Sequence, residues 1–338
     1  MVPKIPAAPP SLDGPHPAVS RIWRSLGGPT PASIEALREV GRSKPALYRL
    51  IFDEPGRVAV YAKRSPTPEM AVERAVYQEV LPGLPLTVPR CLGSYREPDG
   101  STWLFLEEVG DRELSKHPEH ARLAARWLAQ LHGSAAADPR ASKLPDAGPA
   151  RYLGRLRPGR QGIRGNLGNH ALTEADRAIL CALVERLDAL ESSWSEIERA
   201  CEGLPVTLVH GDFRPKNVRI AGPDADPTVY VLDWEMAGWG IPAADLASAF
   251  DREMIVAVDP DTYLEAVRSW WSGLDDAAMR RLAILGRVFQ ALASTEWAST
   301  SLIYDSERYL MRPMAQMRSY LGHLSDAVQA GRETLGWS

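Results

Sequence analysis

The chain reads VHGDFRPKNV at residues 209–218 and VLDWE at residues 231–235. Asp212, Asn217 and Asp233 place two carboxylates and an amide within this short span. Aliphatic and β-branched runs lie before, between and after them, at residues 204–209, 218–220 and 228–232. This arrangement is typical of a small sheet that holds polar groups at the ends of its strands. Rigid placement of this kind is what electrostatic catalysis requires.

Length and composition indicate a soluble globular protein. The 338 residues suffice for one large domain or two lobes, and 45% hydrophobic and 24% charged residues are ordinary values. A net charge of -4 gives no general reason to expect nucleic acid as a partner. No apolar run approaches the ~18 residues that span a bilayer, and the Pro- and Ala-rich residues 1–16 lack the apolar core of a signal peptide. We therefore expect no membrane partner.

The cysteines favour a reducing environment. Cys91, Cys181 and Cys201 are odd in number and far apart, with no CxxC pair. This argues against a disulfide framework or a zinc ribbon. We expect a cytoplasmic protein, and the sequence leaves its oligomeric state open.

The first third of the chain has mostly a strand pattern. After a short helix over residues 17–26, runs at 47–52 and 58–63 flank the turn signal DEPG at 53–56. They predict two antiparallel strands, the second of which ends at Lys63. A helix is predicted over residues 69–80 and a further strand over 103–108, before a break at Gly110.

Beyond Gly110 the pattern becomes mainly helical. An apolar stripe predicts a helix over residues 117–132, and Thr173 is placed to cap a long helix that runs to about Cys201. After Pro242 helices are expected to the end of the chain. Residues 134–169 are predicted to be a mobile surface loop, which carries Arg151, Arg155, Arg157, Arg160 and Arg164 among glycines.

These patterns predict an α+β fold of two lobes. We expect a disordered tail over residues 1–15, and a small lobe over 16–107 with an antiparallel sheet and a helix. A larger, mainly helical lobe is expected over 108–338, with a cleft between the two.

The motifs resemble those of a known family. His210-Gly211-Asp212, with Asn217 five residues after the aspartate and Asp233-Trp234-Glu235 downstream, is similar to the aminoglycoside phosphotransferase and choline kinase family. The resemblance covers residues 33–246 in the same order, and the two motifs are specific in combination. It implies a protein-kinase-like fold whose first lobe binds nucleotide. It also implies an enzyme that uses ATP and Mg²⁺ to phosphorylate a hydroxyl of a small molecule.

The resemblance assigns roles around the first motif. Asp212 is the candidate base that orients the acceptor hydroxyl, and Arg214 is a cation for the transferring phosphoryl group. His210 is included as a catalytic-loop residue, expected to organise the loop through hydrogen bonds rather than to act as an acid or base. Asn217 and Asp233 offer the hard oxygen ligands that Mg²⁺ prefers.

The nucleotide-binding residues are assigned in the same way. Lys63 stands where the family keeps the lysine for the α- and β-phosphates. Its expected partner is Glu73 on the following helix, with Glu79 as the second candidate, and such an ion pair would be partly desolvated. The sequence has no GxGxxG, so Ser43 beside Gly41 is the candidate for the phosphate loop.

The resemblance implies two further assignments. Residues 106–109, which include Glu107 and Val109, are the expected hinge whose backbone meets adenine. Asp245 matches a family aspartate that braces the catalytic loop, for which we expect a structural role.

The sequence does not determine which small molecule is the phosphate acceptor. Aminoglycoside-directed members need clustered carboxylates, for which Asp251, Glu253, Asp259 and Asp261 are candidates. The arginine-rich segment argues mildly against a polycation. An aminoglycoside, an amino alcohol, a sugar and a natural-product hydroxyl all fit, and GTP is not separated from ATP.

Two other functions compete with the kinase. A non-catalytic nucleotide-binding regulatory relative would have lost metal ligands, whereas Lys63, Asp212, Asn217 and Asp233 are all present. A metal-dependent hydrolase that uses His210, Asp212 and Asp233 lacks a His-rich ligand set and leaves Lys63 unexplained.

Overall fold

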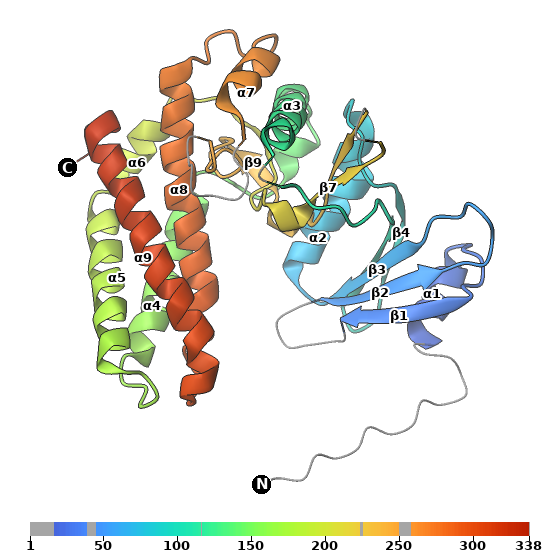
Figure 1. Cartoon of the computed structure of the whole chain (residues 1–338), viewed down its shortest axis with the longest axis horizontal. Coiled ribbons are helices and arrows are strands. Elements are labelled where there is room, and N and C mark those ends of the chain that lie inside the picture. The colour runs from blue at the N-terminus through green and yellow to red at the C-terminus, as the bar shows by residue number, and fades with distance from the viewer. Residues whose placement is uncertain (1–16, 39–44, 116, 224–225, 250–257, 338) are drawn as a thin grey trace.

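The computed structural model describes residues 17–38, 45–115, 117–223, 226–249 and 258–337 (Figure 1). The expected tail over residues 1–15 lies outside this described part, as do Ser43, Asp251 and Glu253. Among the described residues, no helix combines the length and the apolar character that crossing a membrane requires.

The first lobe is built on one antiparallel sheet of five strands in the order β1-β2-β3-β5-β4. The strands are β1 (Ser33–Arg38), β2 (Ala46–Ile51), β3 (Val60–Ser65), β4 (Cys91–Arg96) and β5 (Thr102–Glu107). The strands predicted at 47–52, 58–63 and 103–108 are confirmed, whereas β4 was not expected. One face of the sheet packs against α1 (Pro17–Ser25), where Trp23 contacts Phe52 and Phe105.

The helix after β3 fixes the position of Glu73. It begins as α2 (Pro68–Ala75) and continues as a wider π-helical turn over Val76–Val80 and a 3-10 turn over Leu81–Gly83. The predicted helix over 69–80 is thus confirmed in place. Its buried residues Met70, Val76 and Tyr77 join the main core, and the helix contacts the turn Trp234–Met236 that follows Asp233.

The second lobe is mainly helical. Its helices are α3 (Pro118–Ala135), α4 (Pro149–Asn166), α5 (Glu174–Ser192), α6 (Trp194–Cys201), α7 (Pro260–Val267), α8 (Asp276–Ser299) and α9 (Glu307–Leu335). Figure 1 shows α4, α5, α8 and α9 side by side, at the end of the molecule away from the sheet. Thr173 caps α5 with a complete capping box, but the long helix expected to reach Cys201 breaks at Ser193. The α+β architecture is confirmed, and the boundary after residue 107 stays a prediction.

The prediction of a mobile loop over residues 134–169 is wrong for residues 149–166. Residues 149–166 form α4, and two of its glycines, Gly159 and Gly162, allow close packing against α8. A Cβ on Gly159 would lie 3.1 Å from the Cα of Glu296, and one on Gly162 would lie 2.7 Å from the Ser299 hydroxyl. The arginines are paired: Arg157 with Glu191, Arg160 with Asp188 and Glu191, and Arg164 with Asp188. Low helix propensity is offset here by packing and charge.

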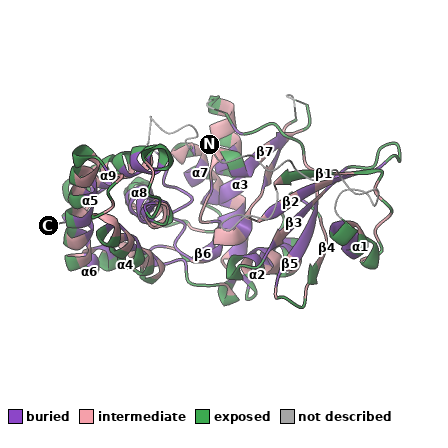
Figure 2. Ribbon diagram, turned by 90° about the horizontal axis from the view of Figure 1, so that it is seen from below, coloured by how far each residue is buried: buried purple, intermediate pink, exposed green. Residues whose placement is uncertain are grey.

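Two small two-stranded sheets hold the motif residues. Strand β6 (Thr207–Val209) pairs with β9 (Gly238–Gly240), and β7 (Val218–Ala221) pairs with β8 (Thr228–Val231). His210 follows β6, Asn217 precedes β7, and Asp233 comes two residues after β8. The expected strands are therefore present in two separate two-stranded sheets rather than in one small sheet. Figure 2 shows the central strands mostly buried, with exposed residues on the outer sides of the helices.

Candidate active site

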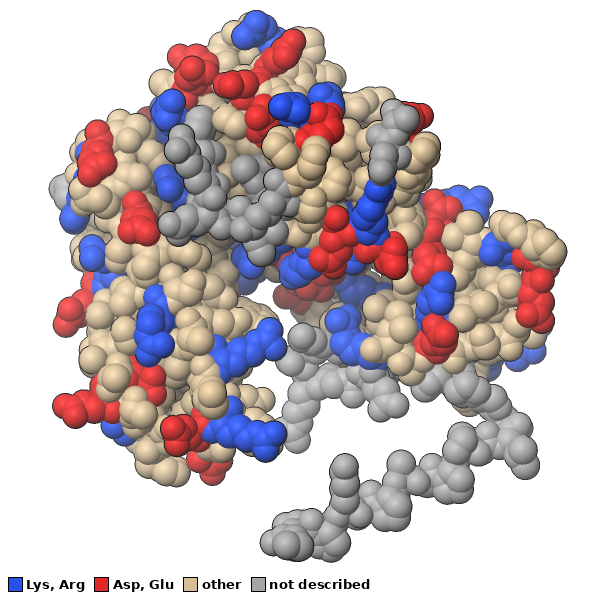
Figure 3. Space-filling model, viewed as in Figure 1, with Lys and Arg blue, Asp and Glu red and all other residues tan. Residues whose placement is uncertain are grey.

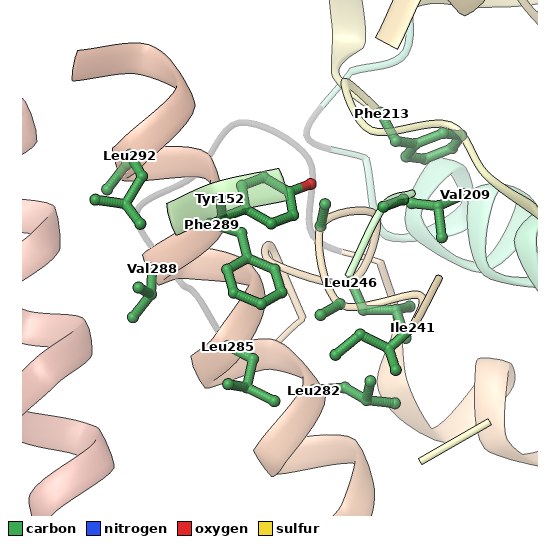
Figure 4. Close-up of a cluster of buried hydrophobic side chains, with 14 of the residues drawn as sticks. Tyr152, Val209, Phe213, Ile241, Leu246, Leu282, Leu285, Val288, Phe289 and Leu292 are labelled. Atoms are coloured by element: carbon green, nitrogen blue, oxygen red, sulfur yellow. The ribbon is translucent and has the colours of Figure 1, made fainter. Parts of the chain in front are cut away.

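The segment after β6 is anchored in the core. Val209 and Phe213, on either side of His210-Gly211-Asp212, are buried beside Ile241, Leu246 and the stacked rings of Tyr152 and Phe289 (Figure 4). Those two ring centroids lie 4.0 Å apart at 4°. Because both flanking residues are fixed, the polar residues between them have little freedom to move.

His210 holds the segment together. Its buried ring accepts a hydrogen bond at Nδ1 from the Asp212 backbone at 3.2 Å, and Nε2 donates to the Leu232 carbonyl at 2.9 Å. This network assigns the neutral ring with its proton on Nε2. Both nitrogens are occupied, so the contacts support an organising role for His210.

Asp245 braces the same segment from the other side. Its buried carboxylate accepts hydrogen bonds from the backbone of His210 at 2.7 Å and of Gly211 at 2.8 Å. His132 of α3 lies 3.2 Å from the same carboxylate and 2.9 Å from the Tyr263 hydroxyl. The bracing role expected for Asp245 agrees with these contacts.

Position 211 requires glycine for two reasons, its positive φ and the close approach of the Met236 carbonyl. Its φ is +82°, and a Cβ there would lie 2.4 Å from the Met236 carbonyl oxygen. Gly211→Ala is therefore expected to lower the free energy of unfolding by about 2–3 kcal/mol, as measured by urea denaturation. The matched control is Gly154→Ala in α4, where nothing lies within 4 Å and a gain of about 0.5–1 kcal/mol is expected. Equal effects of the two substitutions would contradict this account.

Two cationic side chains and one amide surround the Asp212 carboxylate. Arg214 Nε lies 2.7 Å from one oxygen, and Lys216 Nζ lies 2.8 Å from the other. Asn217 donates from Nδ2 to that second oxygen at 3.0 Å and to the Asp212 carbonyl at 2.9 Å. Nη2 of Arg214 donates to the Ser294 hydroxyl of α8 at 3.2 Å. The candidate base, cation and metal ligand of the first motif therefore form one connected group.

A second group forms around Lys63. Its Nζ lies 2.7 Å from Glu73 and 2.5 Å from Asp233, and 3.4 Å from Glu235. The structure thus places Glu73 against the lysine, whereas Glu79 is exposed and lies 3.6 Å from Arg74. Strand β3, helix α2 and the segment after β8 meet at this point. Figure 3 shows acidic and basic side chains together at the junction of the two lobes.

The second group carries excess negative charge. Burial raises the pKa of Glu73 to about 7, against the lowering effect of Lys63, and burial and Asp233 raise the pKa of Glu235. Burial also acts to raise the pKa of Asp233, but the Lys63 ammonium prevails and lowers it. Three carboxylates facing one ammonium leave room for a further cation.

The residues present fit Mg²⁺. One carboxylate oxygen from each of Glu73, Asp233 and Glu235 lies within 4.8 Å of the others, and hard oxygen ligands are what Mg²⁺ prefers. Asn217 uses its nitrogen on Asp212, so its oxygen is the atom it can offer a metal. Glu235 was not assigned to the site from the sequence, although its spacing two residues after Asp233 was a usable signal.

Asp233 has a strained backbone. With φ 67° and ψ 62°, it is the one non-glycine residue of positive φ in the described part of the chain. Aspartate tolerates this left-handed conformation better than most residues, though at a cost. Strain of this kind is concentrated at functional sites, which is consistent with a metal-binding role for the carboxylate.

Hydrogen bonds within the first lobe hold the residues of the expected hinge in place. Glu107 accepts a hydrogen bond from the Arg90 backbone at 2.8 Å, and the Glu108 amide donates to the Ala59 carbonyl at 2.9 Å. Val109 is half-buried and follows directly. The side chain of Glu107 therefore secures the start of strand β4, and contact of residues 106–109 with a nucleotide base stays a prediction.

Helices α4 and α8 border the catalytic segment on the side away from Lys63. Arg155 of α4 pairs with Glu296 of α8 at 2.7 Å, and Arg151 donates to the Met236 and Ala237 carbonyls at 2.9 and 3.2 Å. The sequence did not assign these contacts. Asp259, a candidate for binding a polycation, instead caps α7 by accepting a hydrogen bond from Thr262 at 2.9 Å.

Comparison with known proteins identifies the family. The model of the phosphotransferase enzyme family known as APH matches residues 40–285. No curated protein matches the sequence. Among solved structures, spectinomycin phosphotransferase with ADP and spectinomycin has a TM-score of 0.61 at 8% identity, over 92% of this chain and 98% of that chain. Choline kinase from Cryptosporidium parvum Iowa II has a TM-score of 0.63 at 13% identity, over 94% and 98%.

A third structure has the same fold. The microcompartment-associated aminopropanol kinase has a TM-score of 0.57 at 16% identity and covers 94% of this chain and 98% of its own. At these identities the likeness shows the fold, while the family model covers well over half of the chain. The chain therefore belongs to the phosphotransferase enzyme family and is a small-molecule kinase of the protein-kinase-like fold.

Proposed function

We propose that the protein transfers the γ-phosphoryl group of ATP to a hydroxyl of a small molecule, in a Mg²⁺-dependent reaction. One observation carries the proposal: Lys63, Glu73 and Asp233 meet in one ion-pair group, and Asp212 and Asn217 form another beside it. These are the parts that phosphoryl transfer requires, because the reaction depends on positioning and charge stabilisation.

Each residue has a defined task in this reaction. Lys63, held by Glu73, offers its ammonium to phosphate oxygens, and Asp233 and Asn217 offer oxygen ligands. Mg²⁺, when bound, neutralises charge on the phosphates. Asp212 accepts a hydrogen bond from the acceptor hydroxyl and orients it toward the phosphorus. Arg214, 2.7 Å from Asp212, is placed to offset charge on the transferring group.

The acceptor enters between the catalytic segment and helices α4 and α8. The solved relatives include complexes with spectinomycin and with kanamycin, and an aminopropanol kinase. The acceptor classes that fit are aminoglycosides, amino alcohols, sugars and natural-product alcohols. Relatives were solved with ADP and with GDP, so both ATP and GTP belong in the test. We also propose a cytoplasmic location, in line with three free cysteines.

Thermal shift and a coupled screen test the function. MgATP is expected to raise the melting temperature more than ATP with EDTA does, because the metal ligands are needed for tight binding. A screen of aminoglycosides, amino alcohols and sugars is then expected to reveal acceptor-dependent ADP release. Failure of both nucleotides to bind would overturn the proposal. Nucleotide binding without turnover across all acceptor classes would favour a non-catalytic regulatory relative instead.

A further inference from the structure

A cavity of about 980 Å³ opens at the end of the second lobe where α6 ends, α8 begins and α9 ends (Figure 1). Its volume lies in the range of small-molecule sites. Arg281 of α8 lines this cavity, whereas Ser294 of the same helix contacts Arg214. The two positions are about 20 Å apart along the helix axis, so the cavity is separate from the candidate active site.

Arg281 presents an unpaired charge at this cavity. Its side chain is half-buried, and its Nη2 donates a hydrogen bond to the Glu202 carbonyl at 3.2 Å. Among the described residues, its buried Nε has no hydrogen-bond partner, and no carboxylate forms an ion pair with the guanidinium. A charge that is partly removed from water is costly unless an opposite charge meets it. An anion in the cavity would supply that charge.

The other charged residues of the cavity wall are exposed. They are Asp275, Asp276 and Arg280, at the start of α8. Asp275 caps this helix by accepting a hydrogen bond from the Ala278 amide at 2.8 Å, where negative charge also complements the helix dipole. Water and salt screen exposed charges more strongly than half-buried ones. The charge that a bound molecule meets inside the cavity is therefore mainly that of Arg281.

Trp271 gives the cavity an aromatic wall. Its indole is half-buried and stacks on the ring of His132, with centroids 6.4 Å apart at 16°. Leu204 and Leu274 add apolar surface to the same wall. An apolar wall with an indole favours a ligand that carries a flat ring.

We propose that this cavity binds a small planar organic anion, with its ring against Trp271 and its carboxylate on the terminal nitrogens of Arg281. A guanidinium binds a carboxylate through charge-assisted hydrogen bonds, and its planar shape fixes the orientation of the pair. The ring then covers the apolar part of the wall. This site is independent of the proposed kinase function.

The same indole connects the cavity to the catalytic segment. His132, on which Trp271 stacks, lies 3.2 Å from the Asp245 carboxylate. That carboxylate accepts the backbone amides of His210 and Gly211. A ligand against Trp271 restricts the motion of the indole and of the imidazole packed on it. We therefore expect slower hydrogen exchange at these two amides when the cavity is occupied.

Calorimetric titration of the full chain with three probes tests the site. Naphthalene-2-carboxylate has both the ring and the charge, acetate has only the charge, and 2-naphthylmethanol has only the ring. The first is expected to bind at least about tenfold more tightly than either of the others, because a hydrogen bond to a charged group adds to ring burial. Its affinity should not change in saturating MgATP, since the active site is separate.

Arg281→Met should weaken binding of naphthalene-2-carboxylate by about tenfold or more. Arg287→Met is the matched control, because Arg287 is another half-buried arginine of α8 whose buried Nε lacks a partner among the described residues, but it does not line the cavity. Its affinity should stay within about twofold of the wild-type value. Where Arg281→Met impairs folding, Ala277→Trp serves instead, since it adds volume at an exposed residue of the cavity wall.

Three results would overturn the site. They are equal affinity of the wild-type protein and the cavity variants, equal affinity for 2-naphthylmethanol, and displacement of the probe by MgATP. Hydrogen exchange measured by mass spectrometry tests the connection to the catalytic segment. With naphthalene-2-carboxylate bound, exchange should slow at His210 and Gly211 but not in strand β3 of the first lobe. Unchanged exchange at the two amides, or equal slowing in β3, would overturn the connection while the site stands.

Discussion

Asp212→Asn is expected to lower the turnover number by about 10³-fold, with the affinity for MgATP kept within about threefold. Asparagine preserves the shape of the side chain but removes the charge that attracts the acceptor proton. The side chains of Arg214, Lys216 and Asn217 around this position then face a neutral amide. The loss should appear in acceptor-dependent ADP release, because the group acts on the acceptor and not on the nucleotide.

A remote aspartate provides the control. Asp188 of α5 pairs with Arg160 and Arg164, at 2.8 and 2.5 Å, on the outer side of α4. Asp188→Asn also breaks Asp–Arg contacts, and its side chain is 39% exposed, so it should leave turnover unchanged. A turnover number of Asp212→Asn within tenfold of the wild-type value would show that this carboxylate is not the base. An equal loss in the Asp188 variant would point to general destabilisation.

The sequence predicted the parts of the fold whose signals are local. The turn signal DEPG and the strand pattern that ends at Lys63 predicted β2 and β3, and Thr173 predicted the start of α5. The order of the two motifs gave the family. Pairing of Lys63 with Glu73 followed from the family pattern, and the 2.7 Å contact agrees with it.

Helix α4 was missed because its stabilising contacts are distant in sequence. Pro158 and the glycines of this segment argue for a loop when read locally. What makes the segment helical is its packing against α8, 137 residues away at Gly159 and Glu296, and its ion pairs with α5. Contacts between residues so far apart in the sequence produce no periodic pattern from which a helix can be predicted.

Glu235 was missed for a different reason. It was part of a recognised motif, but its role became apparent only because the fold places its carboxylate oxygen 3.4 Å from Lys63 Nζ.

Asp233→Asn is expected to abolish metal-dependent binding while it leaves the stability of the free protein almost unchanged. The metal ligands lose a carboxylate, so MgATP should no longer raise the melting temperature above the value with ATP and EDTA. Turnover should fall by about 10³-fold, since bound Mg²⁺ contributes several kcal/mol to transition-state stabilisation. Differential scanning fluorimetry and ADP release measure the two effects.

The small effect on the free protein follows from opposing charge terms. The pKa of Asp233 is lowered in the folded chain, so at neutral pH its ionised form contributes stability, which the asparagine variant loses. The pKa values of Glu73 and Glu235 are raised, partly by Asp233, so their ionisation costs stability, and this cost falls when the neighbouring charge is removed. The two changes have opposite signs at neutral pH.

Comparison of Asp233→Ala with Asp233→Asn separates the effect of losing the carboxylate from the effect of backbone strain. Asparagine tolerates the left-handed conformation at φ 67°, whereas alanine there costs about 1 kcal/mol or more. Asp233→Ala is therefore expected to melt below Asp233→Asn in the absence of nucleotide, although both lose the response to Mg²⁺. If MgATP stabilised the asparagine variant as much as the wild-type protein, Asp233 would not be a metal ligand, and its strained backbone would need a structural explanation.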